Sequence, residues 1–468
     1  MRQCGRIDGT RVSPRFRRHE SLTGWQVVAH VPYLAAHIAS IFRPFPFVAL
    51  ATLGPFLIAS VAGGRTVAAR FAGTVGWSTG LFLYALFCVV AFRLGCALSL
   101  KPHPVESEVA VRNRQRTWPV FLTCLALSLA GLLVVKLSVS GNYTSIVVDS
   151  VAGSGFGRTL SDLRVSPEGF LRSVRQPGYI RMFASLTGGA IVLWVGFLAS
   201  HPEEGNKARF LLGLLALVSL LTFKNLLVMD RVHLLGVTVL YAHVVERIVA
   251  SRRASKRAYL KFGGALVLCL SLVVVCLAVG SMVSTMRGLN WAKSVLEYVD
   301  LGTANAELSL RTTRKFTYGF STFFHPVLFA VRGLGLDVSI IPEADSRWIA
   351  NPAANLLAYS LQDFHMYGVI VYVVLGFVVG SAAALCKARP RSLFAQCLYL
   401  YVMYGLYSVW AVPVFRSADY WAGFLVIMIA TLFVGGPQGT TVRRMLAGHR
   451  ASLWASTPLG MRRGRASL

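Results

Sequence analysis

The sequence has few charged residues and very few acidic ones. Only 14% of its 468 residues are charged, whereas soluble globular chains carry about 25%. Asp and Glu together number 19, against 47 Lys and Arg, and 55% of the residues are hydrophobic. A chain with this composition lacks the polar residues that a large water-exposed surface needs, so the composition excludes an ordinary soluble globular protein.

The motifs of common soluble enzymes are absent as well. The sequence contains no P-loop, no HExxH zinc motif and no GxSxG nucleophile elbow. The Gly-rich stretch GSGFG at 153–157 lacks the strand-then-helix context of a nucleotide-binding turn, so we interpret it as a loop. Of the eight cysteines, all but Cys4 fall in or beside apolar runs. The sequence therefore predicts neither a disulfide framework nor a metal site, and no cofactor is expected.

Long apolar runs dominate the rest of the chain. A helix needs about 20 mostly apolar residues to cross a membrane, and the sequence offers a series of such runs. We predict an all-α fold, a polytopic transmembrane helix bundle of about 10 spans, with 12 as the upper bound. The predicted spans are residues 45–62, 75–97, 118–140, 180–200, 209–227, 232–250, 262–283, 362–386, 393–411 and 420–436.

The distribution of basic residues gives these spans an orientation. Lys and Arg gather in the N-terminal segment 1–44, in 251–261, in 387–391 and in the tail 437–468. Cytoplasmic segments of membrane proteins are enriched in Lys and Arg, so both termini are expected in the cytoplasm on either side of a transmembrane domain at 45–436. The net charge of +28 is then explained by topology and by contact with membrane lipids, and binding of nucleic acid is not expected.

Two long segments fall on the opposite, outer side, at about 141–179 and 284–361. Loops of this length in a compact bundle are usually functional, and parts of the second have the apolar spacing of amphipathic helices. Both are rich in arginine, with Arg311, Arg314 and Arg347 in the second. Guanidinium groups bind phosphate in a bidentate manner, so these loops predict an anionic partner such as a lipid-linked pyrophosphate. Contact with anionic lipid headgroups is the alternative.

Ionisable residues also occur at the outer ends of three spans. Ionisable groups within a membrane are costly, which makes them candidates for function. Under the predicted topology they are expected to converge on one site. The pairs are Asp230 and Arg231, Arg416 and Asp419, and Asp363 and His365 in NPAANLLAYSLQDFHMYG at 351–368.

The carboxylates and imidazoles of the outer side have two interpretations. Asp363, His365 and His325 are candidate proton acceptors, whereas the arginines and the two other aspartates are candidates for binding the substrate. Alternatively, Asp363 caps a helix that starts at Phe364, Asp419 caps the last helix, and His325 is satisfied by backbone groups.

Several of these segments resemble a known family. The stretch MDRVHLLGV at 229–237 and the stretch from 351 to 380 resemble O-antigen polymerases and the related oligosaccharide repeat-unit polymerases. In that family an Asp-Phe-Gly stretch enters a span that carries further glycines. Here Asp363 and Phe364 fit the pattern, His365 stands where Gly is usual, and Arg231 fits the arginine of the upstream segment. The glycines that fit are Gly368, Gly376 and Gly380.

The resemblance implies a metal-independent, membrane-embedded glycosyltransferase of the C-type class in a bacterial inner membrane. Its substrate would be an oligosaccharide linked to undecaprenyl pyrophosphate, polymerised at the periplasmic face into O-antigen, capsule or exopolysaccharide. The resemblance leaves a chain-length regulator protein open as a partner.

Other functions remain open from the sequence. An O-antigen ligase shares the architecture of the polymerases. A polyprenyl-phosphate-sugar transferase is disfavoured because the first outer loop, 63–73, contains no acidic residue. A transporter or flippase is disfavoured because the sequence shows no internal repeat and its polar residues lie at one end of the spans and not midway.

Overall fold

The computed structural model describes part of the chain, and all regular elements in that part are helices. The described residues are 43–61, 77–102, 114–138, 189–190, 192–200, 240, 243–244, 247, 291–320, 322–324, 327, 355–409, 415 and 418–435. The predicted all-α class is therefore confirmed for these residues. Several predicted segments lie outside the described residues. They are the spans at 209–227 and 262–283, the first long loop at 141–179, and both terminal segments apart from 43–44.

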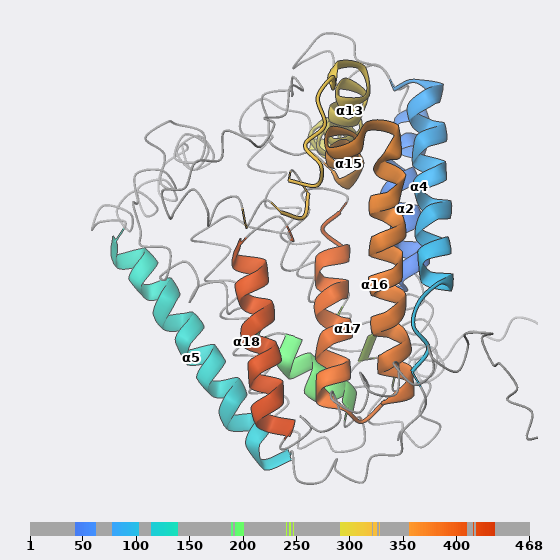
Figure 1. Cartoon of the computed structure of the whole chain (residues 1–468). Coiled ribbons are helices and arrows are strands. Elements are labelled where there is room, and N and C mark those ends of the chain that lie inside the picture. Colours follow the sequence, from blue (N-terminus) through green and yellow to red (C-terminus); the bar gives the residue numbers. More distant parts are fainter. Residues whose placement is uncertain are drawn as a thin grey trace, which may run out of the picture.

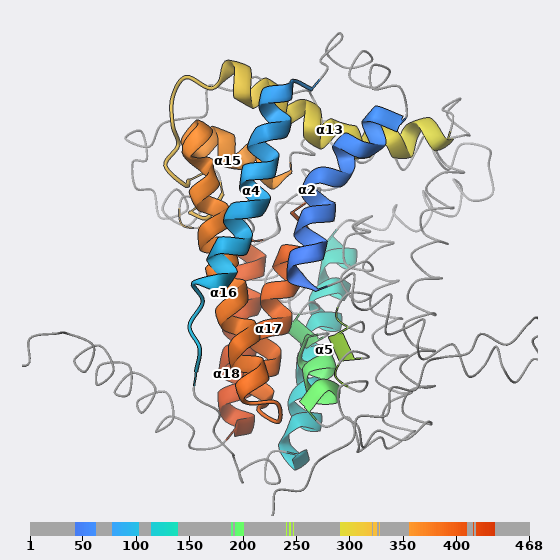
Figure 2. The same cartoon turned by 90° about the vertical axis from the view of Figure 1, so that its right-hand side faces the viewer.

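Six long helices run side by side, and a seventh lies across one end (Figures 1 and 2). The helix across the end is α13 (Trp291–Thr312), within the second predicted outer loop, where the apolar spacing of 291–301 had indicated a helix. The short helices α15 (Leu356–Phe364) and η2 (His365–Gly368) lie beside it. The six long helices are α2 (Pro44–Val61), α4 (Thr79–Ala97), α5 (Arg114–Ser138), α16 (Val369–Ala388), α17 (Leu393–Leu406) and α18 (Ala418–Gly435).

Two of these helical stretches are long and apolar enough to cross a membrane, Thr79–Ala97 and Leu356–Ala388. The second contains a break, and its longer continuous helix is α16, whose 20 residues span about 30 Å, the thickness of the hydrocarbon core of a bilayer. Shorter apolar helical stretches occur at Pro44–Ile58, Trp118–Ala130 and Leu393–Leu406.

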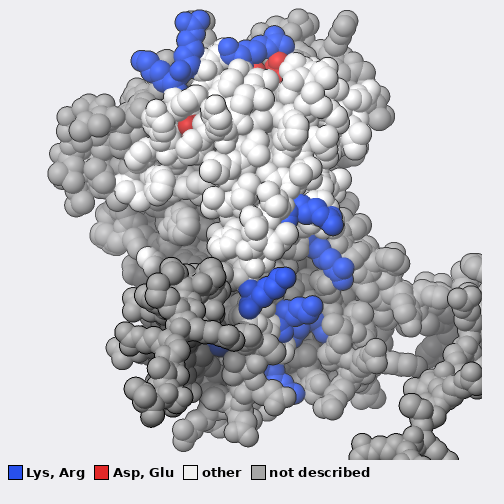
Figure 3. All heavy atoms as spheres, turned by 45° about the vertical axis from the view of Figure 1, so that its right-hand side comes forward, with Lys and Arg blue, Asp and Glu red and all other residues white. Residues whose placement is uncertain are grey.

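The outer faces of these helices are apolar. Phe87 of α4 is 61% exposed, Ile370 of α16 is 56% exposed and Leu425 of α18 is 59% exposed. Figure 3 shows an uncharged band over this face, with Lys and Arg gathered above it and below it. Isolated exposed apolar residues are ordinary, but a continuous apolar band is typical of a surface that another apolar medium covers.

Glycines bring α4 and α16 into direct backbone contact. A Cβ atom at Gly376 would lie 2.1 Å from the carbonyl oxygen of Phe92, and one at Gly95 would lie 2.1 Å from the carbonyl oxygen of Val373. A Cβ at Gly380 would lie 2.9 Å from the Cα atom of Cys96, a less extreme but still close approach. Gly376 and Gly380 form the small-xxx-small spacing with which membrane helices approach one another closely. The glycines of the family-like pattern therefore have a packing role.

The last two helices are joined by a reciprocal pair of tyrosines. The hydroxyl of Tyr401 on α17 donates to the carbonyl of Tyr420 on α18 at 2.6 Å, and the hydroxyl of Tyr420 donates back to the carbonyl of Tyr401 at 3.0 Å. Gly405 makes room for this contact, since a Cβ there would lie 2.7 Å from the Tyr420 hydroxyl. Each buried hydroxyl thus has a partner inside an apolar interface.

Replacing Gly376 by Ala should force α4 and α16 apart, because the atom in the way belongs to the backbone of Phe92 and cannot rotate aside. We expect a loss of about 1–3 kcal/mol of stability, the usual cost of overpacking, measured as a lower midpoint of thermal unfolding in detergent. Gly54→Ala on α2 is the matched control, since a Cβ there meets only the side chain of Leu50 at 3.5 Å. Equal melting of the two variants would contradict the backbone contact.

Candidate functional site

The helix that lies across the bundle, α13, is held to the start of α4 by a buried carboxylate. Glu307 is 1% exposed, and its Oε2 accepts hydrogen bonds from the backbone N–H of Ser78 at 2.9 Å and from its hydroxyl at 2.8 Å. The Ser78 hydroxyl in turn accepts from the N–H of Leu81 at 3.1 Å and so caps α4. A negative charge at a helix N-terminus is favourable because the first N–H groups lack partners within the helix.

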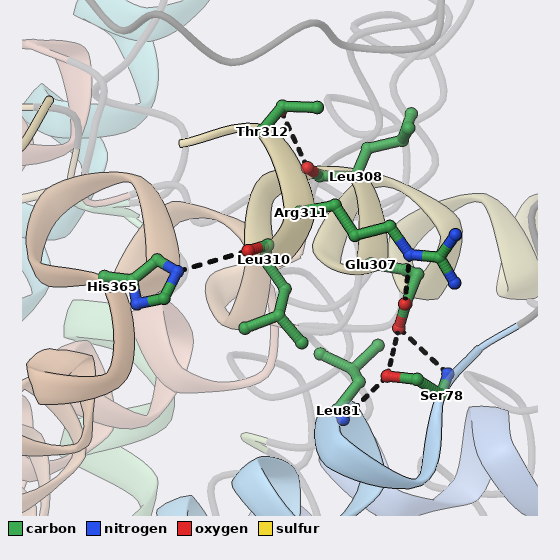
Figure 4. A network of polar contacts seen from close by, with 8 residues as sticks. All are labelled: Ser78, Leu81, Glu307, Leu308, Leu310, Arg311, Thr312 and His365. Atoms are coloured by element: carbon green, nitrogen blue, oxygen red, sulfur yellow. Dashed lines mark hydrogen bonds and ion pairs between the residues drawn. The ribbon is translucent and has the colours of Figure 1, made fainter. Parts of the chain in front are cut away.

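Arg311 completes this network (Figure 4). Its Nε donates to Glu307 Oε1 at 2.6 Å, one helical turn away, while the rest of the side chain is 58% exposed. The buried carboxylate thus fixes the stem of the guanidinium and leaves its outer edge in contact with the surroundings. Such a group is prepared to bind an anion without first being ordered.

On its other side α13 contacts the junction between α15 and α16, at His365. The Nε2 atom of His365 lies 3.1 Å from the carbonyl oxygen of Leu310 (Figure 4). Because a carbonyl oxygen only accepts, Nε2 must carry the proton, and the neutral imidazole then has its lone pair on Nδ1. The residue is partly exposed.

The backbone at this junction is strained. His365 has φ 50° and ψ −129°, a conformation that glycine adopts easily and other residues rarely do. Tyr318 has φ 48° and is the other non-glycine residue with positive φ in the described part of the chain. Strained residues of this kind cluster at functional sites. Both lie close to Asp363. His365 follows it by two residues, and the N–H of Tyr318 donates to the Asp363 carbonyl at 3.1 Å.

Asp363 lies at the centre of these contacts and is fully buried. Its Oδ1 accepts a hydrogen bond from the hydroxyl of Thr317. The N–H of Thr317 also donates to the carbonyl of Gln362 at 3.3 Å. The last turn of α15 therefore binds the segment that follows α13 through both backbone and side-chain groups, and the carboxylate fixes that segment.

Three cations lie at the same end of the molecule as this junction (Figure 3). Arg311 ends α13, and exposed Arg314 and Lys315 lie on the segment that Thr317 and Tyr318 attach to α15. Lys and Arg at this end of the molecule are visible at the top of Figure 3. The site thus combines a cationic rim, defined here as Arg311, Arg314 and Lys315, with an imidazole at the end of an apolar helix bundle.

The structure brings some of the predicted residues together and leaves others undescribed. Asp363, His365, Arg311 and Arg314 share one end of the bundle. Asp419 lies in the first turn of α18, and only its backbone is described. The remaining candidates fall outside the described residues: Asp230, Arg231, His325, Arg347 and Arg416.

One expectation from the sequence is wrong. Asp363 does not cap a helix that starts at Phe364, because it lies in the last turn of α15 and that helix is capped by Asn355, whose side chain accepts from the N–H of Ala358 at 3.0 Å. Sequence reasoning also missed Glu307 and Ser78. The available signal was the spacing of Glu307 four residues before Arg311, which indicates an ion pair on a helix.

Two substitutions at His365 distinguish the energetic cost of its backbone conformation from the contribution of its side chain. His365→Gly removes the strain of positive φ, whereas His365→Ala keeps it, and both lose the hydrogen bond to Leu310. We expect the Gly variant to be more stable than the Ala variant by about 1 kcal/mol or more, measured by thermal unfolding in the same detergent. If Ala proved as stable as Gly, the strained conformation at this junction would be refuted.

Comparison with known proteins assigns no family to this chain. No protein-family model, no curated protein and no solved structure matches it. The resemblance to repeat-unit polymerases therefore stays a prediction, and the function has to be argued from the chemistry of the cationic rim and the junction beside it.

Proposed function

We propose that this chain is a membrane-embedded glycosyltransferase that polymerises oligosaccharide repeat units carried on a polyprenyl pyrophosphate. The observation that carries the proposal is the cationic rim beside His365, at one end of helices that are apolar on their outer faces. A lipid-linked pyrophosphate complements both features. Its polyprenyl chain needs an apolar surface, and its diphosphate needs cations at the membrane surface.

The cationic rim suits the leaving group of such a reaction. When the hydroxyl oxygen of the acceptor sugar attacks the anomeric carbon of the donor, the bond from that carbon to the phosphate oxygen breaks and its electron pair stays on the pyrophosphate. Arg311, Arg314 and Lys315 supply positive charge where this negative charge accumulates. Because Glu307 already holds the Nε of Arg311 at 2.6 Å, this cation needs little reorganisation during the reaction.

His365 is the residue that we assign to accept the proton of the acceptor hydroxyl. Its Nε2–H is directed to the carbonyl of Leu310, which leaves the lone pair on Nδ1. A positioned general base contributes about 10²–10⁴-fold to a rate. No metal ligand takes part in this proposal, and the reaction ends with one new glycosidic bond, a free polyprenyl pyrophosphate and the proton on His365.

Asp363 has a positioning role in this proposal, since its carboxylate is buried and holds Thr317. It thereby sets the place of Arg314 and Lys315 relative to His365. Asn retains a side-chain oxygen that can accept from the Thr317 hydroxyl, so Asp363→Asn preserves much of this contact. Asp363→Ala removes it and leaves the hydroxyl without that acceptor.

The test is polymerisation by the purified full chain in liposomes with a lipid-pyrophosphate repeat unit. We expect a ladder of products. His365→Gln should slow product formation about 100-fold or more, because Gln can still donate to Leu310 but accepts no proton. Arg314→Gln with Lys315→Gln should slow it by a similar factor, because two groups that stabilise the leaving pyrophosphate are lost.

The matched control for loss of charge is Arg43→Gln with Arg93→Gln, two exposed cations outside the cationic rim, which should leave the ladder unchanged. A single transfer to a lipid core in place of a ladder would identify a ligase. Movement of the substrate across the membrane without product would identify a transporter. A full ladder from the His365→Gln variant would refute the assignment of the proton acceptor.

A further inference from the structure

A second group of cations lies at the end of the bundle opposite to α13. Lys101 follows α4, Lys387 ends α16, and Arg389 and Arg391 lie in the turn between α16 and α17. Arg247 reaches the same turn, because its Nη2 donates to the carbonyl of Pro390 at 3.3 Å. Cations below the uncharged band are visible in Figure 3. We call these five residues the lower cationic cluster.

Three segments far apart in the sequence build this cluster. The N–H of Leu100, just after α4, donates to the hydroxyl of Ser381 on α16 at 3.1 Å, which fixes the end of α4 against α16. The side-chain amide of Gln396 on α17 donates to the carbonyl of Pro390 at 2.9 Å, and Arg247 donates to the same oxygen. The cluster is therefore held in place by hydrogen bonds and not merely by proximity along the chain.

The cluster has no counter-charge among the residues that the structure describes. The ion pair between described residues is Arg311 with Glu307, at the other end of the molecule. The Nε atoms of Arg247 and Arg389 are buried, and within the described part of the chain neither has a hydrogen-bond partner. Burial lowers the pKa of the Arg389 guanidinium, because desolvation disfavours its charged form.

Apolar side chains lie next to the cluster on the side facing the band. Leu98 and Leu94 near the end of α4 are 60% and 53% exposed, and Val378 on α16 is 43% exposed. Binding of free phosphate would leave these apolar side chains exposed, whereas the acyl chains of a bound lipid would cover them. The distance between the two ends of α16, about 30 Å, also places the cluster at the level of headgroups if α16 crosses a bilayer.

We propose that the lower cationic cluster binds the phosphate of an anionic phospholipid, whose acyl chains lie along the exposed apolar residues of α4 and α16. The headgroup phosphate supplies the negative charge that the five clustered cations require. This site does not depend on the polymerase function, because it involves none of the residues of the cationic rim.

The test measures binding of fluorescent phosphatidylglycerol to the purified full chain in detergent, with fluorescent phosphatidylcholine as the reference lipid. Phosphatidylglycerol should bind more tightly, and added salt should weaken it. The variant Lys101→Gln, Lys387→Gln, Arg391→Gln changes three exposed side chains, so the fold should survive. Each Lys or Arg near a membrane surface contributes about fivefold to the attraction of anionic lipid, so this variant should bind about 100-fold more weakly.

A charge-preserving control, Lys101→Arg with Lys387→Arg and Arg391→Lys, should bind as the unmodified chain does. Equal binding of the two lipids, or unchanged binding by the glutamine variant, would overturn the proposal. Competition by inorganic phosphate as effective as that by unlabelled phosphatidylglycerol would also overturn it, because it would identify a site for a free anion.

Discussion

Backbone contact between α4 and α16 is the constraint on which the described structure depends. Gly95 and Gly376 let the two helices approach until carbonyl oxygens occupy the space where side chains would otherwise lie. This contact continues to the upper end of α16, where Gly368 lies against the backbone of Ser360 and the hydroxyl of Tyr84. The Tyr84 hydroxyl is 3.0 Å from the Ser360 hydroxyl, so α4 also contacts α15 directly. The position of α15 is therefore fixed by its contacts with α4 and with Gly368, which precedes α16.

The other contacts close a ring around the candidate site. From α15, Asp363 holds Thr317 and with it the segment after α13. His365 contacts α13 at Leu310, and Glu307 of α13 returns to Ser78 at the start of α4. Each link is a hydrogen bond between residues that are distant in sequence, and together they place cations and an imidazole at the end of an apolar helix pair. A loosened link anywhere in this ring would shift the cations relative to His365.

The sequence predicted the helices better than it predicted their junctions. Long apolar runs predicted α2, α4 and α18 to within four residues at each end, because transfer of apolar residues from water dominates the energetics of such segments. The predicted span 362–386 begins seven residues before α16, and the predicted span 393–411 ends five residues after α17. The break at His365 was not predicted, because the residue is neither Gly nor Pro and its hydrogen bond joins it to Leu310, which is 55 residues away. His365 has positive φ, the conformation that Gly adopts most easily, although the residue is not Gly.

The site could be predicted only in part, for a related reason. Burial of Asp363 depends on Thr317, which is 46 residues away, and the role of Glu307 depends on Ser78, which is 229 residues away. No local pattern reveals pairings over such distances. The sequence did identify one end of the bundle as rich in arginine and marked Asp363 and His365, since polar residues at the end of an apolar run are visible without knowledge of the fold.

The central claim is that α16 crosses a membrane and separates the cationic rim from the lower cationic cluster. The most direct measurement replaces Lys315 or Arg391 by Cys, in a chain whose native cysteines are replaced by Ser or Ala, and labels intact and permeabilised cells with a membrane-impermeant maleimide. We expect Lys315→Cys to be labelled in intact cells and Arg391→Cys to be labelled only after the membrane that holds the protein is permeabilised. Labelling of both positions from the same side would contradict the claim.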